Sequence, residues 1–85
     1  MASNHIITAV HPFDLKQKIS VYENGSHTET IECRFEDIES AIASLSSKYN
    51  IDTIYLVGEN IFYNQKIKEN LMTKYANNNF EIIIK

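Results

Sequence analysis

The chain has 85 residues, of which 44% are hydrophobic, and its formal charge is −3. At this length it is expected to fold as one domain, residues 1–85, with a thin core, and its interspersed charges argue against binding to nucleic acid or to an anionic membrane. Cys33 is the only cysteine, so no disulfide can form within the chain, and we expect a reducing, cytoplasmic setting.

The first part of the chain predicts three strands. Residues 5–11 are apolar on both alternating faces, which is typical of a central strand buried on both sides, and Pro12 ends it. Residues 15–22 and 27–35 alternate between apolar and polar side chains, which is typical of strands with one face in water. We expect these consecutive strands to pair as antiparallel hairpins.

The turn between the second and third strands contains Asn24-Gly25, a common sequence for a two-residue hairpin turn. A two-residue turn would place the apolar faces of the two strands on opposite sides of the sheet. We therefore expect a three-residue loop, residues 23–25, with Gly25 left-handed in a bulge. This loop restores the register and places Val21 opposite His27.

Four further elements are expected in chain order, a helix at 35–49, a strand at 53–57, a helix at 64–75 and a strand at 80–84. Asn50 is a plausible left-handed end of the first helix, and Asn60 or Asn64 a cap of the second. The strand at 53–57 is apolar or β-branched on both faces, so we expect it at the centre of the sheet.

This order predicts an α/β (α+β) fold with the element sequence βββαβαβ. Side-by-side placement of consecutive strands gives a five-stranded mixed sheet in the order 3-2-1-4-5, with only the second strand reversed. Right-handed crossovers then put the two helices on one face of the sheet. A ferredoxin-like or other small α+β arrangement is the alternative.

The predicted order of elements resembles the core of the ribonuclease H-like fold, truncated after the fifth strand. Members of this fold that cut nucleic acid carry acidic metal ligands in the first strand, near the end of the fourth strand and after the fifth. The resemblance therefore implies a nuclease site only if this chain has carboxylates at those places. Residues 5–11 hold no carboxylate, and only Glu59 stands at a matching position. Asp14 follows Pro12 in a connecting loop. Because two-metal chemistry needs several converging carboxylates, we expect no metal site and no cofactor.

The face of the sheet without helices is also expected to be apolar. Whichever of the Ile54/Leu56 and Tyr55/Val57 pairs faces the helices, the other pair faces away. Side chains from the neighbouring strands join it, and the expected interface residues are Tyr55, Val57, Ile83 and Ile7. A monomer rarely leaves such a patch in water, so we expect a second copy or another protein to cover it.

Two other positions are weaker candidates for a site. Gly58, Glu59 and Asn60 follow the central strand, where open α/β sheets tend to bind ligands, although a polar loop with Asn60 as helix cap explains them as well. His5 and His11 lie about 20 Å apart along a strand, too far to share one metal ion.

The sequence therefore favours a small, non-enzymatic interaction protein that self-associates or binds a protein partner. Its composition would suit a phage accessory or inhibitor protein, acting in the host cytoplasm, or a small bacterial protein. The alternative is a metal-dependent nucleic-acid-processing enzyme of ribonuclease H-like type, or its inactive remnant, using Glu59 and Asp14. A third class is a binder of a small ligand at Gly58 to Asn60.

Overall fold

The computed structural model describes residues 3–13, 16–75 and 80–85. Its elements follow the predicted order, with one short 3₁₀ helix added before the first α-helix. They are β1 (Asn4–Ala9), β2 (Gln17–Glu23), β3 (Ser26–Cys33), η1 (Phe35–Asp37), α1 (Ile38–Tyr49), β4 (Thr53–Val57), α2 (Ile61–Lys74) and β5 (Glu81–Ile84).

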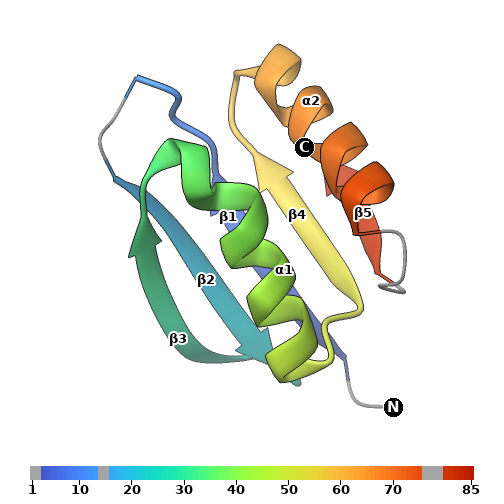
Figure 1. Cartoon of the computed structure of the whole chain (residues 1–85). Coiled ribbons are helices and arrows are strands. Elements are labelled where there is room, and N and C mark those ends of the chain that lie inside the picture. Colours follow the sequence, from blue (N-terminus) through green and yellow to red (C-terminus); the bar gives the residue numbers. More distant parts are fainter. Residues whose placement is uncertain (1–2, 14–15, 76–79) are drawn as a thin grey trace.

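The strands form one mixed sheet in the order β3-β2-β1-β4-β5, which confirms the predicted topology and excludes the ferredoxin-like alternative. β1 is the central strand: it pairs antiparallel with β2 and parallel with β4. β3 continues the antiparallel side and β5 the parallel side. Both helices cover the same face of this sheet (Figure 1), as right-handed crossovers between parallel strands require.

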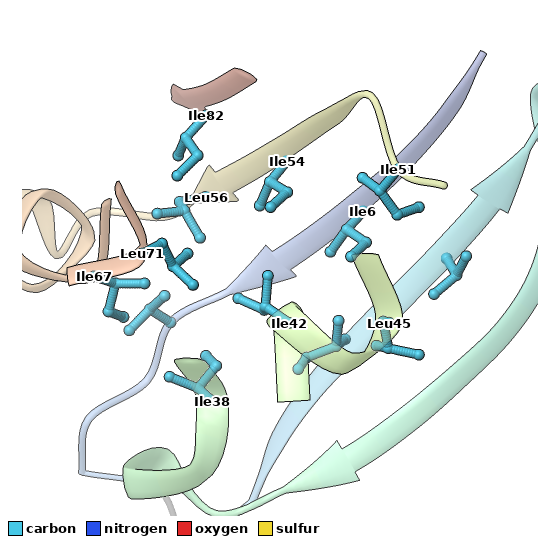
Figure 2. Close-up of a cluster of buried hydrophobic side chains, with 13 residues drawn as sticks. Ile6, Ile38, Ile42, Leu45, Ile51, Ile54, Leu56, Ile67, Leu71 and Ile82 are labelled. Carbon is cyan, nitrogen blue, oxygen red and sulfur yellow. The ribbon is translucent and has the colours of Figure 1, made fainter. Parts of the chain in front are cut away.

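The core fills the space between the helices and the sheet (Figure 2). The helices supply apolar residues at intervals of three or four, and each strand supplies alternate residues, because these spacings bring side chains to one face. The apolar side chains without any exposed surface are those at its centre, Ile6, Ile19, Val21, Ile42, Ile54, Leu56 and Leu71. On β4 the Ile54/Leu56 pair therefore faces the helices.

The β2–β3 hairpin differs from the prediction. Its turn has two residues, Asn24 and Gly25, both with positive φ (53° and 83°), and Glu23 pairs directly with Ser26. The register is corrected farther along, where Tyr22 pairs with His27 but Val21 pairs with Glu29. The extra residue is therefore Thr28, in a bulge within β3. This bulge, rather than a three-residue loop, places the apolar side chains of β2 and β3 on the same face.

The ends of several other elements also differ from the predicted bounds. β1 ends at Ala9 rather than at His11, and Phe35 begins η1 rather than ending β3. α2 begins at Ile61, three residues earlier than expected, so Asn64 lies inside the helix. α1 ends as predicted, with Asn50 in the left-handed conformation (φ 51°, ψ 57°). The predicted start of the second strand, residue 15, lies outside the described residues.

Candidate functional site

The face of the sheet opposite the helices, called here the open face, takes no part in the core beneath the helices. It is built from the alternate residues of every strand that point away from α1 and α2. Among the described residues, no helix lies on it (Figure 1). Its members are His5, Ile7, Ala9, Lys18, Ser20, Tyr22, His27, Thr30, Glu32, Thr53, Tyr55, Val57, Glu81 and Ile83.

One half of the open face is apolar. Ile7, Tyr55 and Ile83 stand side by side on β1, β4 and β5, and Ala9 pairs with Val57. All five side chains are partly buried by one another, yet none belongs to the core beneath the helices. The geometry thus brings together Ile7, Tyr55, Val57 and Ile83, the four residues that the sequence suggested as an interface.

A row of four rings crosses the open face. His5 stacks on Tyr22 with 5.0 Å between ring centroids and 9° between planes, and it meets the edge of Tyr55 at 5.6 Å. His27 continues the row on β3, 5.4 Å from Tyr22, and at the other end the Lys85 ammonium lies 5.0 Å from the Tyr55 ring. The four rings thus form one connected row that runs from β3 across β2 and β1 to β4.

The other half of the open face is polar and tied together by hydrogen bonds. The Thr30 hydroxyl lies 3.1 Å from the Ser20 hydroxyl and 2.7 Å from Nε2 of His27. Glu32 pairs with Lys16 at 3.7 Å. The open face therefore changes from polar at β3 to apolar at Ile7, Tyr55 and Ile83. Its exposed side chains are Lys18, His27, Thr30, Glu32 and Glu81.

The candidate ligand loop after β4 is exposed rather than enclosed. Gly58 has φ 112°, a conformation that favours glycine, and Glu59 is exposed. Asn60 precedes α2, but its side chain makes no capping hydrogen bond. The other acidic candidate, Asp14, lies outside the described residues. Within the described part of the chain, no three His, Cys, Asp or Glu side chains gather closely enough to hold a metal ion.

Buried polar side chains, which the sequence analysis missed, lie beneath the helices. Gln17 is fully buried and clamps the loop after β1, where its amide donates to the His11 carbonyl at 2.6 Å and accepts from the His11 N–H at 2.7 Å. Asn64 is also fully buried, and neither of its amide atoms has a hydrogen-bond partner among the described residues. The sequence does indicate their burial. Gln17 lies two residues before Ile19 and so on the same face of the strand, and Asn64 lies about one helical turn before Ile67.

Phe62 and Tyr63, at the start of α2, are in edge-on ring contact at 5.4 Å but differ in their burial. Tyr63 packs edge-on against Phe35 at 5.6 Å, which joins the two helical segments, whereas Ile61 and Phe62 are 68% and 72% exposed. A shallow hollow on the outer side of α2 is lined by Ile61, Phe62, Gln65, Lys66 and Glu69. These side chains belong to the helical layer, so they are separate from the open face.

The thiol of Cys33 faces the core edge. It is partly buried and packs against the core residues. Burial raises the pKa of the Cys33 thiol, and the negative charge of Asp37 raises it further. A raised pKa keeps the thiol protonated and poorly nucleophilic, which fits a packing role.

Comparison with known proteins identifies the fold. No family model and no curated protein matches the chain. A protein of unknown function from Bacteroides thetaiotaomicron, described as having an actin-like ATPase fold, has a similar structure with a TM-score of 0.69 and 17% sequence identity. The match covers 98% of this chain and 32% of that one, so the chain spans about a third of its length. A likeness at this identity shows the shared fold alone.

None of the helices in the described part of the chain is long and apolar enough to cross a membrane.

Proposed function

We propose that this chain is a small, non-enzymatic interaction protein that acts as a homodimer through its open face. The observation that carries the proposal is the apolar half of that face, where Ile7, Tyr55 and Ile83 lie in one cross-strand row without a covering element among the described residues. A contiguous apolar patch of this kind is costly to leave in water.

A second copy is the simplest occupant. Two-fold dimers are the commonest assembly of identical chains, and in a two-fold dimer one patch needs only to match itself. The five strands are spaced about 4.8 Å apart and are between about 13 and 26 Å long, which gives a face that can pack on a second sheet at a distance of about 10 Å. The assembly would have four layers, with the helices outside and the two sheets inside.

The area that a stable dimer interface would bury is a reasonable fraction of the surface of this chain. A stable interface buries roughly 800 Å² on each partner. The accessible surface of this chain is 5410 Å², so such an interface would take about one seventh of it. Covering the open face would also add a second core to a domain whose own core is thin.

A cytoplasmic setting and a phage or bacterial origin are part of the proposal. A single, partly buried thiol and the lack of any possible internal disulfide favour a reducing compartment. In a larger assembly, the same face could instead bind a different protein, and a strictly monomeric chain would direct the search to that partner.

Light scattering on a size-exclusion column tests the proposal. We expect the wild-type chain to have about twice its monomer mass of 9.8 kDa. Tyr55→Glu and Ile83→Glu each place charge in the apolar half and should yield monomers. The matched control is Phe62→Glu, because Phe62 is 72% exposed on α2 and away from the open face.

The control also separates two kinds of dimer. If Phe62→Glu breaks the dimer and the two open-face variants do not, the interface lies on the outer side of α2 and the proposal is wrong. A wild-type monomer at every concentration would equally contradict it. Circular dichroism of each variant establishes that a loss of mass is not a loss of fold.

A further inference from the structure

We propose that self-association through the open face is controlled by pH, through protonation of His5 and His27. This inference rests on the proposed homodimer and adds its regulation. It starts from the position of the two imidazoles, which are members of the ring row rather than isolated surface side chains.

His5 lies on β1, the central strand of the surface that the second copy would cover, two residues before Ile7. Its ring stands between Tyr22 of β2 and Tyr55 of β4. On β1 itself, its neighbours on the open face are Ile7 and Ala9, both apolar. A proton on His5 would therefore place a cation in the middle of a surface that has to lose its water.

His27 lies at the polar end of the row, where it is more exposed. Its Nε2 is 2.7 Å from the Thr30 hydroxyl, and its ring meets Tyr22 edge-on. The two-residue turn brings His27 to the open face, because it pairs Glu23 with Ser26 and therefore Tyr22, rather than Val21, with His27. Both histidines of each copy thus belong to one continuous surface.

The other charges of the open face do not neutralise two imidazolium ions. β2 and the residue before it contribute Lys18 and Lys16, β3 contributes Glu32, and β5 and its end contribute Glu81 and Lys85. The strand portions of β1 and β4 contribute no charged side chain to it. The formal balance is +1 with both histidines neutral and +3 with both protonated.

Two nearby carboxylates lie off the open face. Glu23 stands on the alternation of Ile19 and Val21, and its carboxylate accepts a hydrogen bond from Thr28 at 3.1 Å. Asp52 precedes β4 and accepts a hydrogen bond from the Asn4 N–H at 3.0 Å. Two opposed copies would therefore bring protonated histidines together on a surface whose carboxylates among the described residues, Glu32 and Glu81, are outnumbered by its cations.

The sign of the effect follows from linkage. A dimer interface that disfavours the imidazolium form binds fewer protons than two free copies, so association is strongest above the histidine range and weakens as pH falls. Each proton that must leave on association raises Kd by up to tenfold per pH unit below that range. Between pH 7.5 and pH 5.5 we expect Kd to rise by at least about tenfold.

The test is a measurement of Kd by sedimentation equilibrium at the two pH values. It compares the wild-type chain with His5→Gln, with His27→Gln and with the double variant. The matched control is His11→Gln. His11 lies in the loop after β1 and makes no ring contact among the described residues, so this variant should keep the full wild-type response.

We expect the double variant to dimerise with the same Kd at both pH values and His27→Gln to keep a reduced response. A wild-type Kd that changes less than twofold overturns the inference and leaves the homodimer intact. So does a double variant that is folded by circular dichroism and keeps the full pH response. A monomer at pH 7.5 overturns the proposed homodimer and, with it, the pH control.

Discussion

Ile6 and Ile7 are adjacent and identical in chemistry, but they lie on different sides of the sheet. Ile6 has no exposed surface and sits in the core beneath α1, whereas Ile7 lies between Ser20 and Tyr55 on the open face and is partly exposed. The same contrast recurs on β5, where Ile82 is buried and Ile83 is not. The strands are apolar on both sides, and the handedness of the two crossovers decides which side becomes the core.

The sharpest test of this contrast compares Ile6→Ala with Ile7→Ala at a concentration low enough to keep the chain monomeric. Ile6→Ala leaves a cavity in a packed core and should lower the free energy of unfolding by about 2–5 kcal/mol. Ile7→Ala removes a partly exposed side chain and should cost about 1 kcal/mol or less. Urea unfolding measures both, and equal losses would show that the two faces are equally packed within one copy.

Asn64 offers a second test of the covered face, because its buried amide has no hydrogen-bond partner among the described residues. Replacing such a group with an apolar side chain of similar shape, Asn64→Leu, should raise the free energy of unfolding by about 1–2 kcal/mol. Asn70, on the same helix, is the control, since its amide donates to Glu39 at 2.8 Å and Asn70→Leu should not stabilise. A loss of stability in Asn64→Leu would reveal a partner for the buried amide.

The end of α1 provides a smaller effect. Asn50 has φ 51°, a left-handed conformation that an ordinary side chain adopts at a cost of about 1–2 kcal/mol. Asn50→Ala should therefore lower the free energy of unfolding by about 1 kcal/mol, while Asn50→Gly should leave it unchanged or slightly raised. If thermal melts show the two variants to be equally stable, the left-handed end is not what stops this helix.

The smallest expected effect concerns a polar contact that ties α1 to the edge strand. The Tyr49 hydroxyl donates to Glu29, and Lys48 lies 3.6 Å from the same carboxylate. The hydrogen bond from Tyr49 is the main reason that the pKa of Glu29 lies below its ordinary value, and the charge of Lys48 contributes less. This contact joins the covered side of β3 to the C-terminal end of α1.

A depressed pKa in the folded chain means that the contact stabilises the fold above the unfolded value, about 4.3 for Glu, and that this gain is lost as pH falls through the folded value. We expect a lower melting temperature at pH 3 than at pH 7, with a smaller acid shift in Tyr49→Phe. Tyr63→Phe is the control, because the Tyr63 hydroxyl has no hydrogen bond among the described residues. If the difference in melting temperature between pH 3 and pH 7 is the same in Tyr49→Phe as in the wild-type chain, the contact with Glu29 does not contribute to the loss of stability in acid.

Much of the fold could be predicted from local patterns. The apolar faces of residues 5–11 and 53–57 identified the two central strands, and the right-handed crossover rule placed both helices. The hairpin could not be predicted correctly, because two structures place the apolar side chains of β2 and β3 on the same face. One is a three-residue loop, and the other is a two-residue turn followed by a bulge. Asn24 tolerates positive φ, so the short turn forms, and the bulge moves to Thr28 on the edge strand.

The candidate site was predictable only in part, for the same reason. Alternation along β4 predicted that either Ile54 or Tyr55 would face away from the helices. The choice between them depends on the register of β1 against β4. The ring row was not foreseen, since the expected loop placed His27 opposite Val21 on the covered side. Buried Gln17 and Asn64 were passed over because polar residues were treated as solvent-facing.

Hydroxyl-radical footprinting across a concentration range shows which face of the chain a second copy covers. We expect oxidation of Tyr55 and Ile83 to slow as the wild-type chain is concentrated at pH 7.5, while oxidation of Phe62 on α2 stays constant. Oxidation of Tyr55 and Ile83 that does not change with concentration, or slows only at Phe62, would contradict a homodimer formed through the open face.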